Sequence, residues 1–583
     1  MTARRFLKES LRFWANQKNF FSYVIAVVPE ALEGGTAIFF YEQIVGASPT
    51  MTDNGAIMKF TRRSGILLHP TSLPGTPGIG TIGKPAFNFV DWLCDAGQSL
   101  WQILPLGPTG YGDSPYASFS TFAGNPLLID LDLLVTAGFL TKKDVRHPEY
   151  IKTTGNVDFG AVVWWKLPLL KKAAENFLSG AGDYDLEQYK AFCRAKKSWL
   201  DDFALFMSIK TVYDKKAAEE KPENSIWYAW WPKKLALHDD DALKEWYKAN
   251  KDDVDSYKVI QFFFDQQWTS LKKYANENGI NLIGDIPIFV APDSADVWSN
   301  QGLFQLDKTG KPNCVAGVPP DYFCADGQLW GNPLYDWKKM KDTGYKWWIA
   351  RIKRVFELTD VLRIDHFRGF EAYWSVPATE KTAINGKWCP GPGYDLFKTI
   401  KSKLGDLPVI AEDLGVITDE VRALREQCGF PGMKVLQFAF SPEEAKQNGM
   451  VNYFLPHMYN TDNCVAYTGT HDNDTMQGWL ENLNDEQLVL VAQYIEGSEL
   501  DVKKARALVS SGKLRKDMIR AVVASSAAYA IIPMQDITGA DNTARMNTPA
   551  TTGTNWTWRM SSKDFRATDA HWLAFLSGLY GRD

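Results

Sequence analysis

The stretch that decides the fold is Val361 to Gly369, VLRIDHFRG. Its apolar run predicts a buried strand that ends at an aspartate, Asp365. Barrel enzymes keep their chemistry at the carboxyl ends of the strands, so this carboxylate is a candidate nucleophile. Arg363 lies two residues earlier on the same face, where its charge favours the ionised carboxylate. The pattern also fits a buried Arg/Asp ion pair that only joins strands, and this stretch alone leaves both interpretations open.

Two later stretches favour the catalytic interpretation. Leu407 to Gly415, LPVIAEDLG, is another apolar strand ending in acid, with Glu412 at its end. Gly469 to Asn473, GTHDN, places His471 and Asp472 in a turn. Because successive strands of a parallel barrel deliver their ends to one rim, we expect these acids to meet Asp365 there.

Such a trio of acids suits glycosidic bond chemistry. One carboxylate attacks the sugar carbon, a second acid protonates the leaving oxygen, and further negative charge supports the oxocarbenium-like transition state. Repulsion between the carboxylates also raises one pKa, which leaves the acid/base protonated at neutral pH.

We expect neither a metal nor a cofactor. His366 and His471 each stand beside a catalytic candidate and lack a spaced ligand set such as H-E-x-x-H, so sugar or carboxylate contacts are the better interpretation. The sequence also offers no G-x-G-x-x-G dinucleotide loop and no P-loop.

The three motifs RIDHFRG, AEDLG and GTHDN resemble the catalytic motifs of glycoside hydrolase family 77, the 4-α-glucanotransferases also called amylomaltases or disproportionating enzymes. Further segments look like family segments in family order, from about Lys59 to the C-terminus: SGILLHPTSLPG, WQILPLGPTG, DSPYASFSTFAGNP, GDIPIFV, GVPPDYF, GQLWGNPLYDW and RMNTPATTGTNWTWR. One departure is Ala550, which stands where the family pattern leads us to expect glycine, so the local turn there is less certain.

The resemblance implies Asp365 as nucleophile, Glu412 as acid/base and Asp472 as stabiliser of the transition state. It also implies Arg363 and His471 as supporting substrate contacts.

The other predicted substrate-binding residues are Tyr116, Asp285, Asp321 and His366. Tyr116 offers a face for stacking on a sugar ring in a Gly/Pro-rich loop. The alternative interpretation is that this loop is an ordinary ordered turn. Asp285 lies within a predicted strand, and the alternative interpretation is that it only caps a loop.

The predicted fold class is α/β, a (β/α)8 TIM barrel with helical and loop insertions and no C-terminal β-sandwich domain. The candidate strands are 66–69, 100–104, 281–290, 361–365, 407–412, 435–438, the approach to 469 and 530–535. We expect the catalytic barrel to span 59–583, with a helical insertion at about 140–260. The resemblance makes the loop at about 313–333 a cover over the substrate, which excludes water from the intermediate.

Residues 1–58 lie outside the resemblance. Basic residues precede a short apolar run, Phe20 to Val28, without an A-x-A cleavage site, and the run is too short to span a bilayer. Three interpretations compete: a targeting segment, a lineage-specific extension, or translation assigned from too early a start. We favour the last, with Met51 or Met58 as the beginning.

Bulk composition is that of an ordinary globular protein, with 583 residues, 45% hydrophobic and 23% charged. A net charge of -5 predicts no nucleic-acid partner, and we expect no membrane partner. Seven cysteines without C-x-x-C spacing indicate reduced thiols in a cytoplasmic setting, with a plastid as the alternative if residues 1–58 form a transit peptide. Oligomeric state is not predicted.

The predicted function is transfer of α-1,4-glucan segments to the 4-hydroxyl of glucose or another glucan, with maltooligosaccharides as substrates. The closest alternative is an α-1,4-glucan hydrolase on the same barrel, in which water completes the reaction. A catalytically silent glucan-binding protein and a structural or regulatory partner are disfavoured, since binding alone gains nothing from mutually repelling carboxylates.

Overall fold

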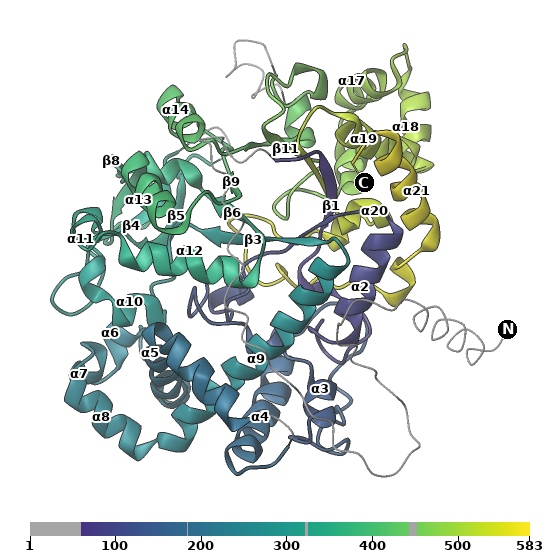
Figure 1. Cartoon of the computed structure of the whole chain (residues 1–583). Helices are drawn as coiled ribbons and strands as arrows, with labels where there is room; N and C mark the ends of the chain where they lie inside the picture. Colours follow the sequence, from purple (N-terminus) through teal and green to yellow (C-terminus); the bar gives the residue numbers. More distant parts are fainter. Residues whose placement is uncertain (1–59, 183–184, 321–323, 442–451, 583) are drawn as a thin grey trace. The chain divides into compact units, whose positions relative to one another are not determined.

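A central barrel of eight parallel strands dominates the computed structural model, which describes residues 60–182, 185–320, 324–441 and 452–582 (Figure 1). The strand order is β10-β11-β12-β1-β2-β3-β6-β9. The bounds are β1 Arg63–Leu67, β2 Leu100–Gln102, β3 Asn281–Pro287, β6 Val361–Asp365, β9 Val409–Ala411, β10 Gly432–Val435, β11 Cys464–Tyr467 and β12 Tyr529–Pro533. The Ala411 N–H donates to the Pro431 carbonyl at 3.0 Å, so the two end strands meet. This confirms the predicted (β/α)8 fold.

The barrel strands are short and apolar because helices cover them on the outside and side chains fill the inside. Ile66, Leu362 and Ile531, on three different strands, have no exposed surface. β1 and β2 approach closely at Gly65, where a Cβ atom would lie 2.3 Å from the Leu100 carbonyl oxygen. Only glycine fits there.

Helices connect the strands in the manner of repeated βα units. Their bounds are α2 Lys84–Asp95, α3 Leu131–Thr136, α4 Phe159–Leu178, α5 Leu186–Glu220, α6 Trp227–Trp230, α7 Lys233–Ala236, α8 Asp240–Ala249, α9 Lys251–Glu277, α10 Ala295–Ser299, α11 Trp337–Asp342, α12 Lys346–Leu358, α13 Tyr394–Leu404, α14 Asp419–Cys428, α16 Met476–Asn482, α17 Asp485–Glu496, α18 Val502–Ser510, α19 Lys513–Ala524, α20 Met534–Thr538 and α21 Ala567–Leu579. The helices α4 to α9, all between β2 and β3, lie together on one side of the barrel strands in Figure 1 (blue to teal).

A second, antiparallel sheet lies outside the barrel, in the order β5-β4-β7-β8. Its strands are β4 Cys314–Val318, β5 Gln328–Pro333, β7 Ala372–Pro377 and β8 Lys387–Pro390. The segment 313–333, which its Gly and Pro content marks as a loop, thus contains two strands. They form because β4 also pairs with β7, a partner about 60 residues away that local composition does not reveal.

One strand differs in position from its prediction. The sequence predicts a strand over 435–438, whereas β10 ends at Val435 and residues Leu436–Phe440 form a 3-10 helix. Leu436 is fully buried and Phe438 packs against the core. An apolar run therefore continues past the strand end, and periodicity over so few residues does not separate the two conformations.

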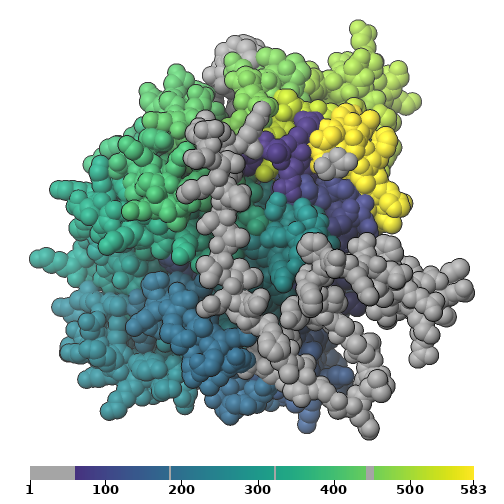
Figure 2. Space-filling model, in the orientation of Figure 1, coloured from purple at the N-terminus to yellow at the C-terminus, as the bar shows by residue number. Residues whose placement is uncertain are grey.

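The C-terminal segment fastens onto the start of the barrel. Arg582 is fully buried, and its guanidinium donates five hydrogen bonds, all to backbone carbonyls, including that of Arg63 at 2.9 Å. The Arg62 Nε in turn donates to the Tyr580 carbonyl at 2.8 Å. Figure 2 shows the corresponding purple and yellow surfaces side by side.

In the part of the chain that the structure describes, no helix is both long and apolar enough to cross a membrane.

Candidate active site

The candidate nucleophile, Asp365, ends strand β6 beside a buried arginine. Arg363 Nη2 lies 2.8 Å from Asp365 Oδ1, and Arg363 Nη1 lies 2.6 Å from Asp285 Oδ2. The Arg363 side chain is only 4% exposed. Burial lowers its pKa, but the neighbouring Asp285 and Asp365 more than offset this, so the pKa of Arg363 is raised. Burial raises the pKa of Asp365, and the adjacent Arg363 opposes that rise. The arginine therefore favours the ionised form of Asp365, as the sequence predicts, while burial acts against it.

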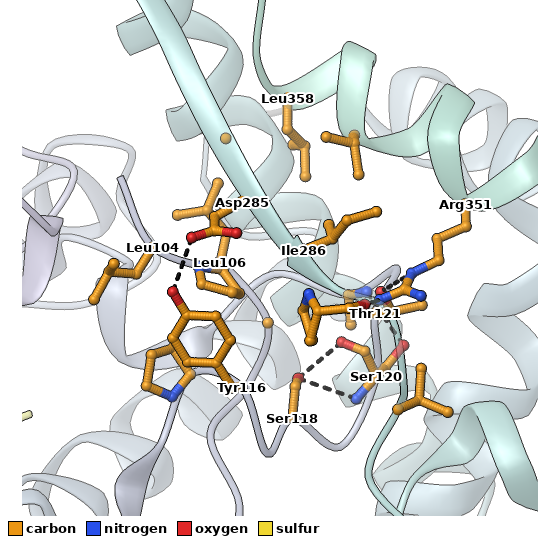
Figure 3. Close-up of a pocket in the computed structure, with 18 of the residues that line it drawn as sticks. Leu104, Leu106, Tyr116, Ser118, Ser120, Thr121, Asp285, Ile286, Arg351 and Leu358 are labelled. Atoms are coloured by element: carbon orange, nitrogen blue, oxygen red, sulfur yellow. Dashed lines mark hydrogen bonds between the residues drawn. The ribbon is translucent and has the colours of Figure 1, made fainter. Parts of the chain in front are cut away.

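Asp285 lies behind the cleft. Its side chain has no exposed surface, and its Oδ2 accepts both from Arg363 and, at 2.8 Å, from the Tyr116 hydroxyl. Figure 3 shows the Tyr116 hydroxyl pointing at Asp285 from a loop, with Arg351 reaching Thr121 on the far side of the same pocket. Asp285 thus holds the arginine that pairs with Asp365.

The residue after the candidate nucleophile has an unusual backbone conformation. His366 adopts the left-handed conformation, with φ at 54°, which costs about 1 kcal/mol for a residue other than glycine. That turn directs the His366 N–H at Glu412 Oε2, at 2.7 Å. Backbone strain of this kind clusters at active sites, where the surrounding structure holds a residue in an unfavourable conformation.

Glu412 follows strand β9 and is almost completely buried. Its Oε1 accepts from the Leu414 N–H at 2.8 Å. Burial first, and the neighbouring Asp365 second, raise the pKa of Glu412 to about 8. The carboxyl is therefore protonated at neutral pH, the state that a general acid requires.

Asp472 lies in the turn that follows β11. Its Oδ1 is 2.6 Å from Asn547 Nδ2 and 3.4 Å from His471 Nε2. The His471 ring stacks on Tyr116, with centroids 5.2 Å apart, so this turn and the Tyr116 loop share one wall.

Several of these residues line a cleft of about 760 Å³. Asp365, His366, His471 and Asp472 line it. Tyr111, Tyr116, Phe119, Phe289, Trp330 and Trp556 add aromatic faces. Broad aromatic side chains beside carboxylates are suited to sugar rings, which present apolar faces and polar edges.

The structure brings most of the predicted residues together. Asp365, His366, His471, Asp472 and Tyr116 line the cleft, whereas Arg363 and Asp285 lie directly behind it. Glu412 does not line the cleft either; it is 9% exposed and is joined to the cleft wall through the His366 N–H. Asp321 lies outside the described residues, so its predicted role stays a prediction.

Sequence reasoning did not single out Asn547, Trp556 or Trp330 as site residues. Asn547 and Trp556 belong to the segment RMNTPATTGTNWTWR, whose family resemblance could have indicated them. Neither residue ends a predicted strand, which is the feature that identifies Asp365 and Glu412. The Trp330 ring stands perpendicular to His366, with centroids 4.7 Å apart, and belongs to β5 of the second sheet.

The fold and site define a class of protein: barrel enzymes that act on glycosidic bonds with carboxyl groups at the strand ends. Residues 68–564 match the family described as 4-alpha-glucanotransferase, glycoside hydrolase family 77, and the chain belongs to this family. This confirms the resemblance found in the sequence.

Individual relatives agree with this family. The chain is 44% identical to a 4-alpha-glucanotransferase of Streptococcus pneumoniae over 522 residues, which are 89% of this chain and 97% of the relative. It is 44% identical to a chloroplastic/amyloplastic 4-alpha-glucanotransferase of Solanum tuberosum, covering 89% of this chain and 86% of the relative. An amylomaltase from Streptococcus agalactiae, solved in complex with acarbose, superposes with a TM-score of 0.81 at 40% identity, covering 89% of this chain and 99% of that one.

Proposed function

We propose that this chain transfers segments of α-1,4-glucan by a retaining double displacement through Asp365, Glu412 and Asp472. In the first step the Asp365 carboxylate attacks the anomeric carbon, the bond from that carbon to the glycosidic oxygen breaks, and Glu412 gives its proton to the departing oxygen. In the second step the 4-hydroxyl of an acceptor attacks the anomeric carbon, the bond to Asp365 breaks, and Glu412 takes the hydroxyl proton. Glucose and maltooligosaccharides are the proposed acceptors.

The single observation that carries the proposal is the unequal state of the two carboxyl groups. Asp365 has an arginine at 2.8 Å, whereas the hydrogen bonds of Glu412 within the described residues come from backbone N–H groups, and its pKa is raised to about 8. Environments that separate two carboxyl pKa values in this way assign one group as nucleophile and the other as acid.

Asp472 is proposed to bind sugar hydroxyls more strongly as positive charge develops at the anomeric carbon. Its side chain is 44% exposed and lines the cleft beside Asp365, which supports this role. His366, His471 and Tyr116 are proposed substrate contacts from the same walls.

The segment 313–333 is proposed to cover the bound glucan. Gly327 to Trp330 and Asn332, at the start of and within β5, line the cleft, and Trp330 is 38% exposed. A cover that excludes water lets a sugar hydroxyl compete for the covalent intermediate, which turns hydrolysis into transfer.

Incubation with maltotriose alone tests this function, with products resolved by length over time. Transfer predicts glucose together with a ladder of longer maltooligosaccharides. Glucose and maltose without the ladder support the hydrolase instead, and an unchanged substrate contradicts both enzymatic functions.

The proposed location is the cytoplasm, with a plastid as the alternative if residues 1–58 act as a transit peptide. The Solanum tuberosum relative is named for a plastid, which supports testing both. Fluorescent fusions with and without residues 1–58 separate them, because only a transit peptide makes the location depend on that segment.

A further inference from the structure

The turn that carries Asp472 is contacted by residues 545–547, which follow strand β12 in the chain. Arg545 Nη2 donates to the Asp472 carbonyl at 2.5 Å, and its Nη1 pairs with the Asp474 carboxylate. The Asn547 N–H donates to the His471 carbonyl at 3.0 Å. The Arg545 side chain and the Asn547 backbone thereby fix this segment against the turn, independently of what the Asn547 side chain does.

Asp472 needs such support more than the other two acids. Asp365 belongs to a strand and Glu412 is held by two backbone N–H groups, whereas the Asp472 side chain is 44% exposed in a turn. A half-exposed carboxylate on a turn rotates freely unless a neighbour bonds it.

We propose that Asn547 is a positioning residue that orients the Asp472 carboxylate for the reaction. Its Nδ2 lies 2.6 Å from Asp472 Oδ1, and a carboxylate only accepts, so the amide N–H donates. His471 approaches the same oxygen at 3.4 Å. Among the described residues both side-chain partners of Asp472 take Oδ1, which leaves Oδ2 for a sugar hydroxyl.

The chemistry of the donor matters as much as its position. A neutral amide fixes the carboxylate without cancelling its negative charge, and that charge is what a developing oxocarbenium ion requires. Arg545, a cation near Asp472, is directed at the Asp474 carboxylate and at the backbone carbonyls of Asp472 and Asn547. The site thus separates the cation that braces the turn from the neutral donor that orients the acid.

A double-mutant cycle with maltotriose tests the proposal, using Asn547→Ala, Asp472→Asn and the pair together. Because misplacing a reacting group by about 1 Å costs about 10²-fold, Asn547→Ala is expected to lower kcat by about 10- to 100-fold with KM little changed. In the Asp472→Asn background the same change is expected to have no further effect, because the carboxylate it orients is gone.

Asn555→Ala is the matched control. Asn555 braces the same segment through the Thr548 and Thr551 carbonyls but has no bond to Asp472. Its effect is expected to be the same in both backgrounds. Asn547→Asp keeps the side-chain shape and replaces the donor with a carboxylate at neutral pH, so it serves as the second variant if alanine prevents folding and is expected to lose at least as much turnover.

Two results overturn the proposal: an Asn547→Ala variant within threefold of wild-type kcat, or an equal loss from that change in both backgrounds. The proposal rests on the proposed role of Asp472, and the cycle tells the two failures apart. If Asp472→Asn alone keeps near-normal turnover, the role of Asp472 is wrong. If that variant is inactive while Asn547→Ala is normal, only the positioning role is wrong.

Discussion

Replacing Glu412 with glutamine is expected to inactivate the enzyme and, above about pH 5, to make its fold relatively more stable as the pH rises. Below pH 4.5, the ordinary pKa of the group, the carboxyl is protonated in both the folded and the unfolded chain. Between 4.5 and about 8 the unfolded chain releases its proton and the folded one keeps it. The folded state then binds more protons, so the wild type loses stability with rising pH over this window, and the glutamine variant does not.

The size of this effect follows from the raised pKa. The interval from 4.5 to about 8, at about 1.4 kcal/mol per pH unit, amounts to about 5 kcal/mol once both states have ionised. A pH-independent term opposes it, because Glu412 accepts from the N–H groups of His366 and Leu414 and the glutamine NH₂ cannot accept from one of them. That loss costs about 1–3 kcal/mol at every pH, so the slope and not the absolute difference carries the prediction.

Urea unfolding of both proteins at several pH values between about 5 and 7.5 measures the difference in unfolding free energy. The variant is expected to gain about 1.4 kcal/mol on the wild type per pH unit, or about 3 kcal/mol across the range. Glu426→Gln, which makes the same substitution at a carboxyl that is 71% exposed on α14, is the control. Two parallel curves for Glu412→Gln and wild type would mean that Glu412 is ionised in the folded protein, and the assignment of the acid would fail.

Three further predictions concern the same site. Asp365→Asn is expected to lower turnover of maltotriose by about 10⁴-fold or more with the fold intact, and near-normal kcat in that variant is incompatible with a nucleophilic role. The pH profile of kcat/KM is expected to fall on the alkaline side near pH 8, where Glu412 loses its proton, and on the acid side above the ordinary pKa of an aspartate, because burial raises the pKa of Asp365. With an α-glucosyl fluoride donor, whose leaving group needs no proton, the alkaline fall in the first step should disappear; a fall that persists there belongs to another group. Ala550→Gly is expected to raise the unfolding free energy by about 1 kcal/mol in urea, because Ala550 holds φ at 62°, where alanine is strained and glycine is not; an unchanged or lower value contradicts that account.

The sequence predicts the barrel and its acids well because each of the two principal carboxyls ends an apolar strand. Asp365 and Glu412 can be identified from the sequence for that reason. A parallel barrel brings the carboxyl ends of its strands to one rim, whatever the length of chain between two strands. The expectation of glycine at 550 also has a physical counterpart in the left-handed backbone there.

What the sequence does not predict depends on partners far apart in the chain. Asn547 reaches Asp472 across 75 residues, and nothing in either segment indicates the bond. The strands within 313–333 exist because β7 is available to pair, and the 3-10 turn after β10 has the same apolar pattern as a strand. Long-range pairing and short apolar runs are the cases in which local pattern carries least information.

The most direct measurement of the central claim is to trap the glycosyl-enzyme. The Glu412→Gln variant is incubated with an α-maltosyl fluoride donor, which leaves without a proton, and the digested protein is examined by mass spectrometry. The proposed mechanism predicts an added maltosyl mass on the peptide that contains Asp365, and no adduct in the matching Asp365→Asn variant. An adduct on another residue, or turnover of the donor without any adduct in the rapidly quenched reaction, would contradict it.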